Sequence, residues 1–301
     1  MLSKADLELR AKLWNHVTKD IQSFFDTRGY TEVRTPLIVR SPGMEPNLDP
    51  VGVDVRLLDG VTHRGGLITS PEYSMKKLLG GGMERIYTLT PVFRNVEKMG
   101  ERWSVEFTML EWYRTGADYN ECMRETEELV NGILGLTGSW PRVSYVKEFE
   151  KQFGVHPADA PKDMNVADKF QFEVMPRLEK EYDRFFLVEY PVAEAALAQK
   201  NADGRSAQRF EGYVKGIEIC NGFTELVDSA EQRVRFEAEA KERAEAGKEV
   251  FPIDEELLLR LSSVPSPTFG NALGVDRLIM LKAGMNDIDS IHLFPPSERF
   301  N

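Results

Sequence analysis

The stretch from Ile86 to Arg114 constrains the fold of this chain more than any other, because it predicts two strands joined by a charged loop. Alternation along the second strand gives one face Phe107, Met109, Glu111 and Tyr113, and the other face Glu106, Thr108, Leu110 and Trp112. Each face therefore combines large apolar groups with a carboxylate, which is costly to bury without a partner. A simple amphipathic hairpin with glutamates at its rim would show the same pattern. Arg94, at the end of the first strand, favours a binding site, because a guanidinium pairs with a carboxylate or a phosphate.

Composition excludes several classes of protein. The 301 residues are 42% hydrophobic and 29% charged, which is enough for a sizeable core in one or two domains. No run approaches the ~20 apolar residues that a membrane span needs, and the amino terminus is charged where a signal peptide would be apolar, so we expect a cytoplasmic protein. A net charge of −11 disfavours general binding of nucleic acid. Two cysteines and four scattered histidines predict neither disulfides nor a zinc site.

Before this central stretch, Ser3 can cap an amphipathic helix that ends near Gly29, and a short extended piece closes at Pro36. Residues 53–58 and 65–69 predict a hairpin. Ser70-Pro71-Glu72 then begins a helix. Glu72 is either an acid favoured by the helix dipole or a ligand for an amino group.

After the central stretch, residues 118–136 and 144–153 predict helices, and residues 185–190 predict a buried strand. We expect residues 193–200 to be helical as well. Residues 230–247 predict an exposed helix whose charges form a solvated face.

Residues 209–228 predict a second hairpin with carboxylates on it. If its turn centres on Val214 and Lys215, Glu211 and Glu218 lie directly opposite each other, which is unfavourable unless a cation separates them. Magnesium bound to nucleotide phosphates would do so; a different strand register would remove the need for it. Further along, Asn221, Phe223 and Glu225 share one face, which suits a long apolar stem that ends in an ammonium group.

A glycine-rich segment, Phe269 to Arg277, leads into an apolar helix. The exposed backbone amides of such a segment can cradle phosphate, although the pattern alone is weak.

Several motifs resemble those of class II aminoacyl-tRNA synthetases. Phe93-Arg94-Asn95, a loop and Glu106-Phe107-Thr108 resemble motif 2, the amino-terminal helix and extended piece resemble motif 1, and Phe269 to Arg277 resembles motif 3. Ser70-Pro71-Glu72, Phe107 to Tyr113 and Cys220 to Leu226 resemble the lysyl-tRNA synthetase branch, and are similar to the free-standing paralogues that attach lysine or β-lysine to a lysine of elongation factor P. The resemblance covers nearly the whole chain.

The resemblance implies an α+β fold, with a mainly antiparallel sheet flanked by helices, and residues 1–301 as a single catalytic domain. Because it begins almost at residue one, we expect no anticodon-binding domain. Motif 1 implies a homodimer. The implied reaction uses ATP and Mg²⁺ to form the adenylate of lysine or β-lysine and passes it to elongation factor P; we do not expect tRNA as the acceptor.

The resemblance also implies roles for residues. Arg94 would hold the α-phosphate of ATP and Arg277 the γ-phosphate, while Glu211 and Glu218 would carry magnesium and Phe107 would stack on adenine. Glu72 would take the α- or β-ammonium of the amino acid, and Glu111, Tyr113 and Glu225 its side-chain ammonium. The remaining residues are Asn95, Glu97, Ser104, Ile219 and Gly274 at ATP, and Ser70, Pro71, Asn221, Phe223 and Ala272 at the amino acid.

The chain departs from the family pattern in two places. The motif 2 loop has one residue extra, which puts the ATP contacts of Glu97 and Ser104 in doubt. Ala272 replaces the middle glycine of motif 3, and its methyl group is expected to narrow the pocket floor and to favour a β-amino acid.

Two alternative functions remain open. A truncated synthetase that charges tRNA would want basic surface, which the net charge of −11 disfavours. A non-catalytic regulatory paralogue would be expected to lose a phosphate-binding arginine or a magnesium carboxylate, and all of these are present.

Overall fold

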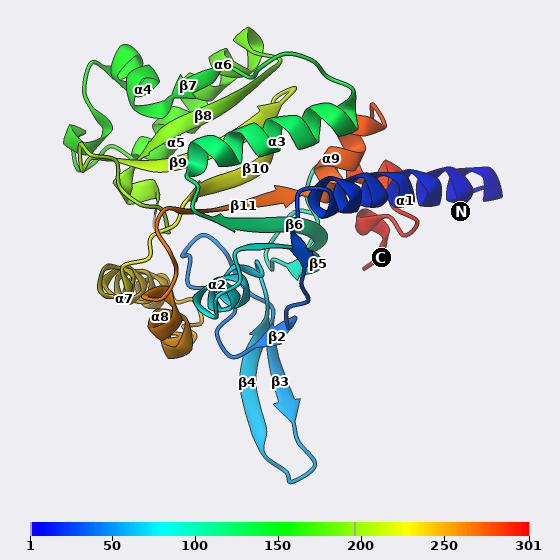
Figure 1. Ribbon diagram of the computed structural model, residues 1–301, viewed down its shortest axis with the longest axis horizontal. Helices are drawn as coiled ribbons and strands as arrows, with labels where there is room; N and C mark the ends of the chain where they lie inside the picture. The colour runs from blue at the N-terminus through cyan, green and yellow to red at the C-terminus, as the bar shows by residue number, and fades with distance from the viewer. Residues whose placement is uncertain (1, 196, 301) are drawn as a thin grey trace.

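An eight-stranded sheet forms the centre of the protein in the computed structural model, which describes residues 2–195 and 197–300 (Figure 1). The pair at each edge, β1–β5 and β7–β8, is parallel, and the pairs between them are antiparallel. The expected mainly antiparallel sheet is therefore confirmed. In sheet order the strands are β1 (Thr31–Glu32), β5 (Arg85–Phe93), β6 (Glu106–Thr115), β11 (Thr268–Gly274), β10 (Ile217–Thr224), β9 (Ser206–Val214), β8 (Arg184–Pro191) and β7 (Arg142–Ser144).

One face of this sheet packs against α1 (Lys4–Asp26), α3 (Tyr119–Leu134) and α9 (Val275–Lys282). Ser3 and Asp6 form a capping box at the start of α1, and Asp118 caps α3. Leu110 and Trp112 of β6 are fully buried in this core, where the Trp112 ring lies against Phe25 of α1. The predicted amino-terminal helix and the predicted helix over residues 118–136 are thus confirmed.

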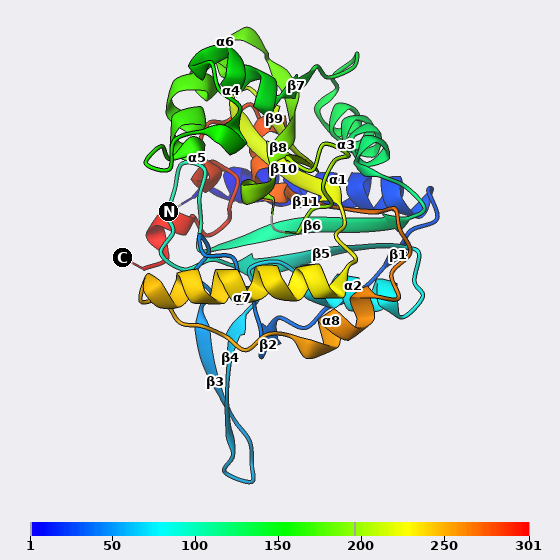
Figure 2. The ribbon, with the colours of Figure 1, turned by 90° about the vertical axis from the view of Figure 1, so that its left-hand side faces the viewer.

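The opposite face is covered by α2 (Glu72–Gly80), α7 (Ser229–Glu245) and α8 (Glu255–Leu261), as Figure 2 shows. Tyr113 of β6 packs with Met75 and Leu79 of α2. Alternate residues of β6 therefore point to different layers, as the sequence pattern predicts.

A smaller sheet of β2 (Ile38–Val39), β4 (Thr62–Leu67) and β3 (Gly52–Arg56) projects from the body as a long hairpin (Figures 1 and 2). This confirms the hairpin predicted over residues 53–69. None of the helices in residues 2–195 and 197–300 combines the length and apolar character needed to span a membrane. The other helices are α4 (Tyr145–Phe153), α5 (Val166–Lys169) and α6 (Met175–Glu181), with short turns η1 (Pro157–Asp159), η2 (Phe170–Val174), η3 (Val192–Glu194), η4 (Ile288–Ser290) and η5 (Pro296–Glu298).

The helix predicted over residues 193–200 is wrong; Ala196 lies outside the described residues. After η3, Ala198 and Lys200 form bridges with Glu225 and Ala207, and Gln199 accepts a bond from Gln208 N–H and donates one to Thr224 O. Ala195 and Ala198 are buried. Pairing with strand residues on both sides satisfies the backbone here, which outweighs the helical propensity of alanine.

The solvated face predicted for residues 230–247 is only partly correct. Arg243 of α7 is 1% exposed, and its guanidinium donates to the carbonyl oxygens of Glu45, Leu48 and Glu249. The guanidinium also lies 3.5 Å from the Asp49 carboxylate. Arg243 therefore ties α7 to the loop that leads from the small sheet toward the central cavity.

Replacing Arg243 with Met is expected to lower the free energy of unfolding by about 3 kcal/mol, because three carbonyl oxygens lose the donor that the buried guanidinium provides. Denaturant titration measures the change. Lys241→Met on the same helix is the control, since Lys241 is exposed and its 3.8 Å pair with Glu245 is open to solvent. Equal effects of the two substitutions would contradict the anchoring role.

Candidate active site

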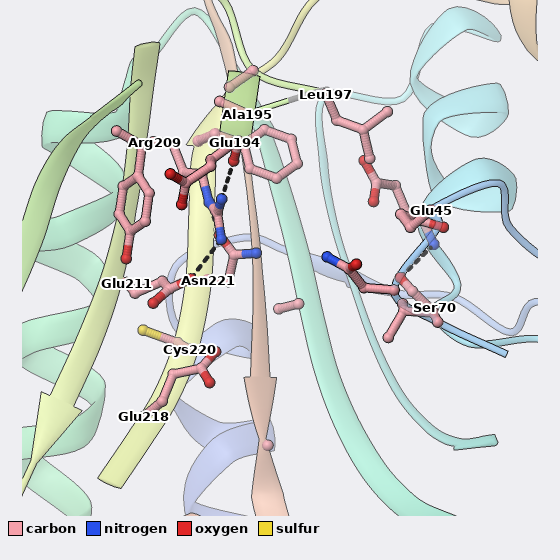
Figure 3. Close-up of a pocket in the computed structure, with 18 of the residues that line it drawn as sticks. Glu45, Ser70, Glu194, Ala195, Leu197, Arg209, Glu211, Glu218, Cys220 and Asn221 are labelled. Atoms are coloured by element: carbon pink, nitrogen blue, oxygen red, sulfur yellow. Dashed lines mark hydrogen bonds and ion pairs between the residues drawn. The ribbon is translucent and has the colours of Figure 1, made fainter. Parts of the chain in front are cut away.

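A cavity of about 1050 Å³ opens on the face of the sheet that α2 and α7 cover. Its floor is formed by β6, β11, β10 and β9, so residues far apart in sequence meet there (Figure 3). Most of the predicted site residues line it: Ser70, Glu72, Arg94, Glu97, Ser104, Phe107, Glu111, Tyr113, Glu211, Glu218, Ile219, Asn221, Phe223, Ala272, Gly274 and Arg277.

Three predicted site residues do not line this cavity. Pro71 is the N-cap of α2. Asn95 is exposed, and its backbone N–H donates to Asp49 O at 2.7 Å. Glu225 is 1% exposed and lies behind the cavity wall, paired with Lys76.

The predicted register of the second hairpin is wrong. The turn falls at Lys215 and Gly216, one residue later than expected, so Glu211 pairs with Asn221 and Glu218 pairs with Tyr213. A bulge between Glu218 and Cys220 adds a residue to β10. Because of this bulge, Glu218 and Asn221 both face the cavity, although they are three residues apart. Glu211 and Glu218 therefore still face the same cavity, although the strand pairing that places them there differs from the predicted one.

Arg209 is the cation that these strands bring into the cavity. Its guanidinium donates to Glu211, to Asn221 Oδ1 at 3.1 Å and to Glu194 O, and it lies over the Tyr190 ring (Figure 3). Glu211 also accepts a hydrogen bond of 2.6 Å from the Tyr213 hydroxyl. Figure 3 shows this group across the cavity from Ser70 and Glu45.

The residues predicted to hold phosphate form a second group. Arg94 is largely buried, its Nε has no hydrogen-bond partner, and its guanidinium lies 5.2 Å from the centre of the Phe107 ring. Arg277, at the start of α9, lies 3.5 Å from the Glu218 carboxylate and donates to Glu218 O. Burial lowers the pKa of Arg94, which means that its charge is incompletely compensated. This end of the cavity can therefore take an anion.

Asp276 holds the adjacent strand in place. Its carboxylate accepts from Thr108 N–H of β6 at 2.8 Å and lies 2.8 Å from His292 Nε2. These contacts join the start of α9 to β6 and to the carboxyl-terminal segment. They therefore fix the position of the neighbouring residue, Arg277.

Carboxylates gather at the other end of the cavity. Glu111 accepts from the Ser70 hydroxyl at 2.6 Å and from the Tyr113 hydroxyl at 2.5 Å. Burial and the nearby Glu72 raise the pKa of Glu111 to about 8. Burial also raises the pKa of Glu225 to about 8, although Lys76 opposes the shift. Such shifts indicate that the carboxylates at this end outnumber their single cation, Lys76, so it can take an ammonium group.

The fit of a divalent cation can be judged from Glu211 and Glu218. Burial and the nearby Glu211 raise the pKa of Glu218, although the nearby Arg277, Arg94 and Arg209 oppose the shift. Within residues 2–195 and 197–300 no three acidic, histidine or cysteine side chains cluster as a complete metal cage. Two carboxylates fit magnesium that takes its other ligands from phosphates and water.

Two residues of this site were absent from the sequence prediction, although a signal existed for each. Lys76 lies four residues after Glu72, which places both on one face of α2. Arg209 lies two residues before Glu211, which places both on one face of β9.

Comparisons with known proteins agree with this geometry. A model of the family described as tRNA synthetases class II (D, K and N) matches residues 1–298. The chain belongs to this family. It is 36% identical over 305 residues to a protein of Enterobacter sp. (strain 638), and 37% identical over 311 residues to one of Edwardsiella ictaluri (strain 93-146). Each alignment covers 92% of both chains, and each relative is named Elongation factor P--(R)-beta-lysine ligase.

Class II synthetase motif 2 corresponds here to β5, β6 and the loop between them. The altered loop is closed by Arg94 N–H, which donates to Val105 O, and by mutual bonds between Gly100 and Trp103. Ile288 N–H donates to Glu101 O at 2.7 Å, so the carboxyl-terminal segment supports the loop. Ser104 is buried, and its hydroxyl accepts from Glu106 N–H.

Two glycines of the segment that resembles motif 3, Gly270 and Gly274, differ in the space that is available for an added methyl group. At Gly270 a Cβ would clash with Tyr113 and Glu225, whereas at Gly274 the nearest atom would be Arg277 Cδ at 3.8 Å. Gly270→Ala is therefore expected to lower the free energy of unfolding by ~1–3 kcal/mol through overpacking. Gly274→Ala, the control, is expected to change it by less than ~0.5 kcal/mol. Denaturant titrations of both variants test this, and a stable Gly270→Ala protein would contradict it.

Proposed function

We propose that this chain is an ATP-dependent ligase that activates lysine or β-lysine as its adenylate and transfers it to a lysine ε-amino group of elongation factor P. One observation carries the proposal: a single cavity has the guanidinium groups of Arg94 and Arg277 at one end and clustered carboxylates at Glu72 and Glu111 at the other. A molecule with phosphate at one end and ammonium at the other fits this polarity. The names of the two relatives support elongation factor P as the acceptor.

In the first step, the amino-acid carboxylate attacks the α-phosphorus of ATP, and pyrophosphate leaves with the electrons of the broken P–O bond. Arg94 would stabilise negative charge on the α-phosphate and Arg277 would hold the γ-phosphate, while Phe107 stacks on adenine. Magnesium held by Glu211 and Glu218 would neutralise phosphate charge. Because no covalent intermediate with the protein is needed, positioning and charge stabilisation account for the rate.

The carboxylate end would hold the amino acid. Glu72 would receive the α- or β-ammonium, and Glu111, Tyr113 and Glu225 would receive the side-chain ammonium, which needs several acceptors when buried. Glu225 lies behind the wall, so it would reach the substrate only after a small shift of its side chain. Ala272 pairs with Glu111 and Asn221 on neighbouring strands, and its methyl group would shorten the space for the α-carbon and favour (R)-β-lysine.

In the second step, the ε-amino nitrogen of the acceptor lysine attacks the carbonyl carbon, and AMP leaves. That amine must first lose a proton, against an ordinary pKa of about 10.4. Glu45, Glu239 and Glu242 line the cavity wall near α7, and burial raises the pKa of Glu239 to about 8. An acidic wall attracts an amine and repels the phosphates of tRNA.

The proposal includes the whole chain as one catalytic domain that works as a cytoplasmic homodimer. Leu9, on the outer side of α1, is 67% exposed and offers apolar surface for the motif 1 contact. The alternatives, a tRNA-charging enzyme and a non-catalytic regulatory paralogue, are outcomes of the tests below.

Arg94→Ala is expected to slow lysine-dependent exchange of pyrophosphate into ATP by at least about 100-fold, because a charged donor to the reacting phosphate is worth ~3 kcal/mol or more. Circular dichroism should show an intact fold. Arg124→Ala is the control, because Arg124 is exposed on α3 and pairs with Glu121 there. Near-normal exchange by Arg94→Ala would refute the role given to motif 2.

The acceptor is tested by incubating the purified protein with ATP, magnesium and either lysine or (R)-β-lysine, together with elongation factor P or tRNA. Mass spectrometry is expected to find one added amino-acid unit on elongation factor P, and labelled amino acid is expected to be absent from tRNA. Label on tRNA with an unmodified protein factor would favour the tRNA-charging alternative. Absence of pyrophosphate exchange would favour the regulatory paralogue.

A further inference from the structure

Lys76 is a buried cation among the carboxylates that would hold the amino acid. Its Nζ lies 2.5 Å from Glu72 Oε1 and 2.6 Å from Glu225 Oε2, and its side chain is 2% exposed. The Phe223 ring centre is 5.4 Å from the same ammonium group. Lys76 does not line the cavity, so it acts on a bound molecule through the two glutamates and not by contact.

The carboxylates around Lys76 form a group that we name the cage: Glu72 from α2, Glu111 from β6 and Glu225 after β10, with Lys76 itself. Ser70 and Tyr113 donate hydrogen bonds to Glu111, and they are neutral. With every member ionised, three carboxylates and one ammonium leave two net negative charges.

Charged groups of other elements also face the cage. Glu45 and Glu239 both repel Glu72, but Glu45 lies near Arg94 and Glu239 lies near Arg235, which compensate them in part. The charge of the cage is therefore set mainly by its own four members.

We propose that Lys76 is a positioning residue: by pairing with Glu72 and Glu225 it offsets one of the three carboxylate charges, so that the fully ionised cage carries two net negative charges, matching the two ammonium groups of lysine or β-lysine. This inference rests on the proposed function, because it concerns the same amino-acid site. Removing Lys76 would leave three buried carboxylates with no internal cation, and such a group takes up protons at neutral pH.

Protonation of the cage makes substrate affinity depend on pH, which a purely structural role of Lys76 in packing would not do. The pKa values of Glu111 and Glu225 are each raised to about 8, and Lys76 lowers both of them from still higher values. Because the substrate binds the ionised cage, its affinity should increase as pH rises through about 8 and then level off. Without Lys76 these pKa values rise further, so the increase moves to higher pH.

The test measures KM for lysine in pyrophosphate exchange between pH 6.5 and 9, for the wild type, Lys76→Met and Lys76→Arg. Losing an opposite charge at this distance shifts a carboxyl pKa by ~1 unit or more, so Lys76→Met should raise KM at least about 10-fold at pH 7. The ratio to wild type should shrink toward pH 9, with kcat changed less than KM. Lys76→Arg keeps the charge, and its pH profile should follow the wild type.

A Lys76→Met profile parallel to the wild type at every pH would overturn the inference. If that variant does not fold, calorimetric titration of lysine into the wild type, in two buffers of different ionisation enthalpy, decides the question. Glu111 and Glu225, with pKa values of about 8, are mostly protonated at pH 7, so one to two protons should be released there for each lysine bound. Zero release would overturn the proposal. Failure of the wild type to exchange pyrophosphate with either amino acid would instead refute the proposed function.

Discussion

The alternation of side chains along β6 is the constraint on which the rest of the protein depends. One set of residues, including Leu110 and Trp112, is packed against α1 and α3. The alternate set, including Glu111 and Tyr113, faces α2 and lines the cavity. A sheet that buried both faces in apolar contacts would be more stable, but it would have no place for a polar substrate.

Burying so many charges requires internal compensation, and three cations provide it. Arg209 pairs with Glu211, Lys76 pairs with Glu72 and Glu225, and Arg243 donates to backbone carbonyl oxygens of the loop that enters the cavity. Ion pairs of this kind add little net stability, because desolvation cancels most of the attraction. Their effect is to hold the carboxylates in fixed positions where a cationic or metal-bound ligand can meet them.

The family of the chain and most of its site residues could be predicted from short segments. Arg94, Glu111 and Arg277 stand in short motifs, and the resemblance of those motifs to class II synthetases is enough to identify them, because the residues of each motif are close together in sequence. The errors have a common origin in tertiary contacts. Where a helix is expected over residues 193–200, residues 198–200 instead pair with β9 and with the residues at the end of β10. The hairpin of Glu211 and Glu218 turns one residue later than expected and contains a bulge.

The sequence by itself determined which face of each strand a side chain occupies, because that depends only on parity along the strand. It also determined the helix starts at Ser3 and Asp118, since capping is local. The tertiary structure alone decided which carboxylates share a cation. Glu72 and Glu225 are more than one hundred and fifty residues apart, and they meet at Lys76 only because α2 packs over the sheet at the end of β10. The alternation along a strand sets the face on which a side chain lies, but the distance between two charges depends on the packing of whole layers.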